Sequence, residues 1–225
     1  MPEAKVETFF PLNYFIETKQ PPVNSKEWGK LNRTKFEFNV TNKDNKLIIT
    51  RGTKGPRCEL KIPTGKLVGM DNGDLGGKLT FKPSDATKPT IEVKKGNIKF
   101  IFLMKDVIYF IEGIANFEKN EGSMYQLDIV GDVFKPKKVM TFEDAPEAFA
   151  IFNGSLLIAS YNNFYRVTDL NKETLLKGLF WNGLFPTSIA PFDDTHIYIG
   201  LRSGYAKMDL TTNKLTFYRY EIIQL

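Results

Sequence analysis

The sequence predicts an all-β fold, and two observations support that prediction. Apolar and polar residues alternate with period two through most of the chain, which is the pattern of half-buried strands, whereas the 3.6-residue period of amphipathic helices is almost absent. The strand-like runs are short, and turn signals such as Asn153-Gly154 and Thr212-Asn213 separate them at intervals of roughly 8–12 residues. Such a pattern is typical of antiparallel sheets.

The predicted elements follow one another along the whole chain. In the first half, the strand-like runs are Lys35–Val40, Lys46–Thr50, Cys58–Ile62, Lys78–Lys82, Thr90–Lys94, Ile98–Leu103 and Val107–Ile111. In the second half, they are Ser123–Ile129, Lys137–Phe142, Ala148–Phe152, Leu156–Ser160, Phe164–Thr168, Glu173–Leu176, Ser188–Pro191, His196–Gly200, Ala206–Leu210 and Lys214–Arg219. A helix is expected to begin at Ser25, and one helical turn is expected after Glu112.

Internal similarity distinguishes between the all-β architectures. Residues 146–167 and 186–208 align at a shift of 40 to 41 residues. Each copy reads as a strand, a tight polar turn, a second strand that ends in a small residue (Ala159 or Gly200), a short loop and a third strand. A fourth strand follows each copy, an earlier copy begins at Ile98, and a degenerate one spans Leu47 to Val93.

A repeating unit of about 40 to 50 residues with four antiparallel strands is typical of a β-propeller blade. The small residue at the end of the second strand fits this interpretation, because inner strands crowd together near a central axis. We therefore expect a single small β-propeller domain over residues 1–225, with residues 47–220 forming four blade-like repeats and residues 1–46 closing the ring. Five blades are favoured, and four blades or a β-sandwich are the alternatives.

Composition and charge exclude several classes of protein. A chain of 225 residues with 42% hydrophobic content can bury a core, and no segment has the roughly 18 uncharged apolar residues of a membrane-spanning helix. Residues 1–100 carry a net charge of +8 and residues 101–225 a net charge of −3, but the lysines are scattered singly and form no basic stripe. We expect neither a nucleic-acid nor a membrane partner, and a cytoplasmic location by default, with an exported mature form as the alternative.

The residue counts also limit the chemistry. One cysteine, Cys58, permits no internal disulfide, and one histidine, His196, cannot form a multi-histidine metal site. We expect no cofactor and no metal. The basic neighbours of Cys58 would lower its pKa, although its place on a strand favours an ordinary half-buried thiol. Asp193 precedes His196 closely, but no nucleophile elbow accompanies this pair, so an exposed or satisfied histidine is the better interpretation.

Several short motifs resemble those of a group of uncharacterised bacterial β-propeller-like proteins. They are Glu112-Gly113-Ile114-Ala115, Glu121-Gly122-Ser123, Asp144-Ala145-Pro146-Glu147-Ala148, Phe180-Trp181-Asn182-Gly183-Leu184-Phe185-Pro186-Thr187-Ser188, Tyr198-Ile199-Gly200-Leu201-Arg202-Ser203-Gly204, and Gly76-Gly77 before Phe81. The resemblance covers residues 75–220 and leaves the N-terminal third unmatched. It implies a propeller fold and a bacterial source, and it implies no established activity.

The repeat frame places four candidate ligand-binding residues near one mouth of the predicted axis. Glu112 and Arg202 follow the second strands of their repeats and are expected to form an ion pair, Glu147 lies at the entry to a first strand, and Trp181 would supply an aromatic wall. Such a charged cup would bind a small polar ligand or a side chain of a protein partner. The alternative interpretation is a salt bridge between blades and a tryptophan in the core.

Two classes of function follow from this frame. The first is a non-catalytic binding propeller that recognises a protein partner or a small polar ligand, for instance a bacterial immunity or inhibitor-type protein. The second is a hydrolase or lyase that uses axial carboxylates, either Glu112 with Glu147 or Glu143 with Asp144, because glycoside chemistry needs two acids about 5 to 10 Å apart. The absence of a second histidine, a metal motif or a nucleophile elbow favours the binding protein.

Overall fold

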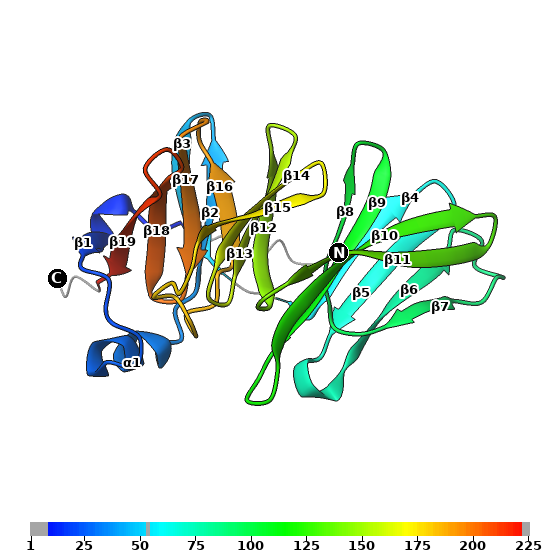
Figure 1. Cartoon of the computed structure of the whole chain (residues 1–225), viewed down its shortest axis with the longest axis horizontal. Helices are drawn as coiled ribbons and strands as arrows, with labels where there is room; N and C mark the ends of the chain where they lie inside the picture. The colour runs from blue at the N-terminus through cyan, green and yellow to red at the C-terminus, as the bar shows by residue number, and fades with distance from the viewer. Residues whose placement is uncertain (1–8, 53–54, 222–225) are drawn as a thin grey trace. The chain divides into compact units, whose positions relative to one another are not determined.

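The computed structural model describes residues 9–52 and 55–221 and confirms the all-β prediction (Figure 1). The strands of these residues form five sheets of two to five strands. Contacts between residues divide the described chain into two compact units: residues 9–52, 147–167 and 173–221 form the first unit, and residues 55–146 and 168–172 form the second. The single domain over residues 1–225 stays a prediction.

Three sheets lie mainly in the first unit, and strands adjacent in sequence are neighbours in each of them. One sheet has the order β1-β19-β18-β17-β16, another has the order β12-β13-β14-β15, and the third is the hairpin β2-β3. The bounds of the strands are β1 (Phe15–Thr18), β2 (Phe38–Lys43), β3 (Lys46–Arg51), β12 (Pro146–Phe152), β13 (Ser155–Ser160), β14 (Phe164–Thr168), β15 (Asn171–Leu176), β16 (Ser188–Pro191), β17 (His196–Leu201), β18 (Gly204–Asp209) and β19 (Lys214–Tyr220).

Two four-stranded sheets form the second unit, with the orders β4-β5-β6-β7 and β11-β10-β9-β8. All the strand pairs within these two sheets are antiparallel. The bounds are β4 (Arg57–Ile62), β5 (Gly65–Asp71), β6 (Gly77–Pro83), β7 (Ile91–Lys95), β8 (Ile98–Met104), β9 (Val107–Ala115), β10 (Asn120–Val130) and β11 (Val133–Phe142), and the short 3₁₀ helix η2 (Gly73–Leu75) connects β5 to β6.

The N-terminal segment adds a strand to one sheet of the first unit and an isolated bridge to another. Phe9 forms an isolated bridge with Thr50 of β3, and, after the 3₁₀ helix η1 (Leu12–Tyr14), β1 pairs antiparallel with β19, as Figure 1 shows for the blue and red ends of the chain. The expected helix is present as α1 (Lys26–Asn32). The Ser25 side chain accepts a hydrogen bond from the backbone N–H of Trp28 at 3.1 Å, which satisfies one of the free donors of the first turn.

In two sheets, a glycine on the second strand leaves no room for a Cβ, because the first strand of another sheet of the same unit lies against it. The two contacts are Gly69 of β5 with Ile98 of β8 in the second unit, and Gly200 of β17 with Phe38 of β2 in the first unit. The sequence predicts crowding at Gly200 and at Ala159, and the side chain of Ala159 is fully buried on β13. Small residues at this position therefore permit close approach between sheets.

The structure differs from the sequence analysis at three places. The helical turn expected after Glu112 is absent, because residues 112–115 continue β9 and pair with β10. Residues 46–51 form β3 and pair with β2, so the four-stranded sheet predicted to begin at Leu47 consists instead of β4 to β7. The sequence pattern does not reveal β5, because Gly65 and Gly69 interrupt its alternation of apolar and polar residues.

Each unit buries its own apolar side chains. In the second unit, Leu67, Leu79, Phe110 and neighbouring residues of both sheets form one cluster. In the first unit, a large cluster gathers around residues from β13, β17 and the loop before β16, and a second cluster surrounds Phe38 of β2. These cores fix the sheets whose ends carry the candidate residues.

Candidate functional site

The four residues that the sequence proposes for a charged cup fall into both units. Glu112 belongs to the second unit, whereas Glu147, Trp181 and Arg202 belong to the first. The expected Glu112–Arg202 ion pair is replaced by two others, since Glu112 pairs with Lys94 and Arg202 pairs with Glu37. The cup that would join all four residues stays a prediction.

Arg202 fixes the backbone around it. Its guanidinium donates to Glu37 Oε1 at 2.7 Å and to the carbonyl oxygen of Asn32 at 2.9 Å, and it lies 4.9 Å from the centre of the Phe185 ring. These contacts connect the end of α1, the segment before β2 and the loop before β16. They support the alternative interpretation of Arg202 as a structural salt-bridge residue.

Trp181 lies in the core of the first unit. Its side chain has no exposed surface, and its indole Nε1 donates to the carbonyl oxygen of Ser160 at 3.0 Å. Because both the ring and its polar atom are buried and bonded, Trp181 offers no face to a ligand in this structure. This placement supports the alternative interpretation of a core tryptophan.

The remaining carboxylates proposed for catalysis differ in burial. Glu147, the second residue of β12, is buried. Burial of the Tyr161 phenol, and then the charge of Glu147, raise the pKa of Tyr161. Asp144 is also buried, while Glu143 beside it is exposed. Glu112 and Glu147 lie in different units, so the pair of axial acids stays a prediction.

Glu112 is the centre of a polar cluster formed by three strands. It lies on β9 opposite Ser123 of β10. The Tyr125 hydroxyl, also on β10, donates to Glu112 Oε1 at 2.6 Å, and the Lys94 ammonium from β7 binds Glu112 Oε2. Both carboxylate oxygens are therefore engaged. Burial, and then the hydrogen bond to Glu112, raise the pKa of Tyr125, so this hydroxyl remains a donor at neutral pH.

The Tyr125 ring holds this cluster in place. It stacks on Phe110 with the two ring centres 4.9 Å apart and the planes nearly parallel. The ammonium groups of Lys94 and Lys138 lie 4.7 Å and 5.6 Å from the centre of the same ring. Phe110 is fully buried, so the aromatic pair anchors the polar side chains to the core of the second unit.

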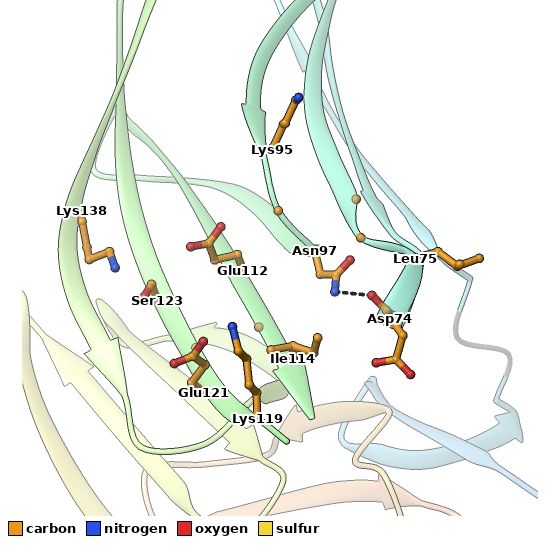
Figure 2. A pocket seen from close by; sticks show the side chains of 16 residues that line it. Asp74, Leu75, Lys95, Asn97, Glu112, Ile114, Lys119, Glu121, Ser123 and Lys138 are labelled. Carbon is orange, nitrogen blue, oxygen red and sulfur yellow. Dashed lines mark hydrogen bonds between the residues drawn. The ribbon is translucent and has the colours of Figure 1, made fainter. Parts of the chain in front are cut away.

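Beside this cluster lies a pocket of about 520 Å³, formed entirely by the second unit. Five segments surround it: the turn from η2 to β6, the β7–β8 connection, the end of β9, the start of β10, and β11. The labelled side chains in Figure 2 that carry charge or a hydroxyl are Asp74, Lys95, Glu112, Lys119, Glu121, Ser123 and Lys138. The volume lies within the range of roughly 300–1,000 Å³ typical of small-molecule sites.

Glycines keep this pocket open. Gly96 has a φ of +144°, a conformation that side-chain-bearing residues rarely adopt, and a Cβ there would collide with Glu112 Oε2. Gly77 lies against the backbone of Met70 in the same way. A larger residue at either position would displace the wall of the pocket.

One buried acceptor in the pocket wall has no hydrogen-bond partner among the described residues. Asn97 is 8% exposed, and its Nδ2 donates to the carbonyl oxygen of Gly73 at 2.8 Å, while its Oδ1 accepts no hydrogen bond. The Nδ2 bond ties the β7–β8 connection to η2. Buried acceptors without a partner are uncommon in native proteins, and they concentrate at functional positions.

Among the residues around this pocket, the sequence predicts a binding role only for Glu112, although the motifs Glu121-Gly122-Ser123 and Gly76-Gly77 also line it. The sequence analysis did not identify Lys94, Tyr125, Lys119 or Lys138, because these residues come from three strands and one turn that no local motif connects. One usable signal was present. Six glycines that line the pocket stand at or near strand ends: Gly73, Gly76, Gly77, Gly96, Gly113 and Gly122.

The other motifs have ordinary structural roles. Asp193 caps the turn before β17 by accepting from the backbone N–H groups of Thr195 and His196, both at 2.7 Å. The Cys58 side chain is partly buried, and burial raises the pKa of its thiol to about 11. Asp71 pairs with Lys99 at 2.7 Å. No group of three or more potential ligand side chains is placed to hold a metal ion within the described ranges.

The chain was compared with known proteins. No protein-family model and no curated protein matches it. Similar solved structures include the β-propeller domain of Myceliophteria thermophila Cps50 (Swd1), with 11% identity, a TM-score of 0.41 and coverage of 74% of this chain and 52% of that one. A puromycin hydrolase has 13% identity, a TM-score of 0.41 and coverage of 83% and 39%.

A cobalt-substituted Synechocystis ACO has 10% identity, a TM-score of 0.36 and coverage of 69% and 46%. The chain thus spans about half, or less, of the length of these three solved chains. Likenesses this weak assign no activity to it. In the described part of the chain, no helix has the length and apolar character needed to cross a membrane.

Proposed function

We propose that this protein is a non-catalytic binding protein and that its ligand site is the pocket beside Glu112. The observation that supports this proposal is the pocket itself: a volume of about 520 Å³ next to a cluster in which Glu112, Lys94 and Tyr125 hold one another. A preformed cavity with a few fixed polar groups is the usual form of a small-ligand site. The ligand is a small polar molecule.

The arrangement around Glu112 favours binding over catalysis. A general acid or a nucleophile must turn its carboxylate toward the substrate. Both oxygens of Glu112 already accept, one from Tyr125 and one from Lys94. The hydrolase or lyase that uses axial carboxylates remains the alternative prediction, as does recognition of a protein partner by an immunity or inhibitor-type protein.

We also propose that the five sheets are the blades of a small β-propeller. Four of them consist of four consecutive strands in chain order, with β1 added to the last, as a blade does. Within each unit, a glycine on the second strand of one sheet lies against the first strand of another, Gly69 against β8 and Gly200 against β2, as neighbouring blades would.

A small-molecule screen with a matched pair of variants tests the binding function. Glu121 is exposed and lines the pocket, so Glu121→Trp would fill the pocket, whereas Glu121→Gln keeps its size and removes only the charge. The readout is the backbone amide NMR shift of the pocket residues during titration with phosphate, succinate, glucose, glycine or putrescine. The proposal predicts that at least one probe binds the wild type and Glu121→Gln but not Glu121→Trp.

Two results would contradict the proposal. One is that no probe in the set binds the wild-type protein at about 10 mM or below, a concentration that detects even weak fragments, on the order of −3 kcal/mol in binding free energy. The other is that a probe binds all three proteins equally, which would place its site elsewhere. A melting temperature for each variant shows that the fold is intact.

A further inference from the structure

We infer that the pocket beside Glu112 recognises an oxyanion group of a small molecule, and that Lys119 and Lys138 hold it. This inference rests on the proposed binding function and specifies its ligand class. The shared chemistry is a carboxylate or a phosphate, which ammonium groups and hydroxyl donors bind through charge-assisted hydrogen bonds.

The acidic side chains Glu112 and Asp74 beside the pocket already accept hydrogen bonds from other residues of the protein. Glu112 accepts from Tyr125 and pairs with Lys94. Asp74 Oδ1 accepts from the Asn116 side-chain amide at 2.6 Å, which joins η2 to the turn before β10. Glu112 therefore cannot bind a cationic ligand without losing a protein contact, whereas Asp74 keeps its charge.

The basic side chains at the pocket, in contrast, have no acidic counter-ion in the described part of the chain. Within the described ranges, Lys119 and Lys138 form no ion pair with an acidic residue, although both line the pocket. In the view of Figure 2, the two labelled side chains lie on either side of Ser123. An ammonium group without a protein counter-ion beside a cavity is a ready partner for an anion.

The charged side chains at the pocket that lack an ion-pair partner carry more positive than negative charge. Lys95 also lines the pocket without an ion-pair partner, and Glu121 is the one acidic lining residue in the described chain for which no polar contact is present. Asp74 also keeps its charge, because its partner Asn116 is neutral, so the lysines Lys95, Lys119 and Lys138 exceed the carboxylates Asp74 and Glu121 by one positive charge. Ser123 adds a largely buried hydroxyl that is hydrogen-bonded to Tyr125 in this structure and that can donate to an oxyanion by turning away from it.

The backbone geometry supports the positions of these donors. Ser123 lies opposite Glu112 in the β9–β10 ladder, and Lys138 lies opposite Tyr125 in the β10–β11 ladder, next to a register shift. The shift between Met124 and Tyr125 is a β-bulge, a feature that redirects side chains and is frequent beside functional sites. Strand positions hold donors more rigidly than loop positions do.

The experiment titrates the wild-type protein with four named probes at constant ionic strength, with sodium chloride as the balancing salt. The probes are inorganic phosphate, succinate, neutral glucose and cationic putrescine, and the readout is the backbone amide NMR shift of Ser123 and its neighbours. Lys119→Gln and Lys138→Gln each remove one ammonium. Lys137→Gln is the matched control, because Lys137 is exposed on the same strand as Lys138 and does not line the pocket.

The inference predicts that phosphate or succinate shifts the pocket amides and that each of Lys119→Gln and Lys138→Gln weakens binding about tenfold, the effect of losing one charge-assisted hydrogen bond. Lys137→Gln leaves the affinity unchanged. Glu121→Gln acts in the opposite direction, with about threefold tighter binding, as expected when a like charge about 7 Å away is removed in water. Phosphate alone would indicate a phosphorylated ligand, and succinate alone a carboxylic acid.

Three outcomes would overturn the inference. If glucose or putrescine shifts the pocket amides and neither anion does, the pocket binds ligands of another class and the proposed binding function stands. If Lys137→Gln weakens anion binding as much as Lys138→Gln does, the effect is the general field of the surface. If no probe shifts the pocket amides, both the oxyanion inference and the proposed function fail.

Discussion

Replacing Gly200 by alanine tests the close approach between sheets in the first unit. The new methyl group would lie 2.7 Å from the hydroxyl oxygens of Ser188 and Thr187, and it would collide with the carbonyl oxygen of Phe38 on β2. Those hydroxyls hold β2 in place, since Ser188 Oγ accepts from the backbone N–H of Val40 at 2.8 Å and Thr187 Oγ1 donates to the Phe38 carbonyl. The added group therefore forces β2 away from β17.

The cost follows from these contacts. Overpacking a closely packed position costs about 1–3 kcal/mol, and here the obstructing atom is backbone, which cannot rotate aside. Complete loss of the hydrogen bonds of Ser188 and Thr187 to β2 would add about 1 kcal/mol each. Burial of one methyl group returns about 0.8 kcal/mol. We therefore expect Gly200→Ala to lower the free energy of unfolding by about 2–4 kcal/mol.

Urea unfolding followed by tryptophan fluorescence measures this change, because Trp28 and Trp181 both lie in the same unit as Gly200. Gly29→Ala is the matched control. Gly29 lies within α1, and a methyl group added there would meet nothing within 4 Å, so the same substitution should stabilise the protein by about 1 kcal/mol through helix propensity. A Gly200→Ala protein within about 0.5 kcal/mol of the wild type would refute the packing argument.

Three further predictions concern other parts of the molecule. Since burial raises the pKa of the Cys58 thiol from 9.0 to about 11, a disulfide reagent at pH 8 should label the folded protein slowly and the unfolded protein fast, and equal labelling rates would contradict this. The contribution of the protonated thiol to the free energy of unfolding should be complete below pH 9 and lost as the pH rises toward 11. A double-mutant cycle of Arg202→Met with Glu37→Gln should give a coupling energy of about 1 kcal/mol in urea unfolding, because this pair is more than three-quarters buried; a value near zero would remove the structural role of Arg202. Gly96→Ala should displace the Glu112 carboxylate and destabilise the second unit by about 1–3 kcal/mol. The unfolding transition followed by near-UV circular dichroism of the tyrosines in this unit measures the change, and an unchanged transition would contradict the predicted collision.

The sequence predicts the secondary structure well wherever local chemistry decides it. Alternating apolar residues reveal most strands, and the helix begins after Ser25 as expected. The prediction fails where pairing with another strand determines the local structure. The residues after Glu112 extend β9 because β10 is present to pair with them. The pattern of β5 is interrupted by Gly65 and Gly69, whose missing side chains make room for Phe81 of β6 and Ile98 of β8.

The candidate site is less predictable, because its residues meet only in the folded chain. Glu112 stood out in the sequence, but its ion-pair partner is Lys94 on another sheet of the same unit, rather than Arg202. Trp181 looked like an aromatic wall, and its burial became visible only once the strands around it were placed. Spacing along the chain indicated neither the pairing of Ser123 with Glu112 nor the β-bulge beside Tyr125.

Crystal structures of the protein soaked separately in succinate and in phosphate test the central claim most directly. We expect at least one of the two anions inside the pocket of the second unit, with an oxygen within hydrogen-bond distance of the Lys119 and Lys138 ammonium groups and the Ser123 hydroxyl. The contradicting result is a pocket that holds ordered water alone in both soaks.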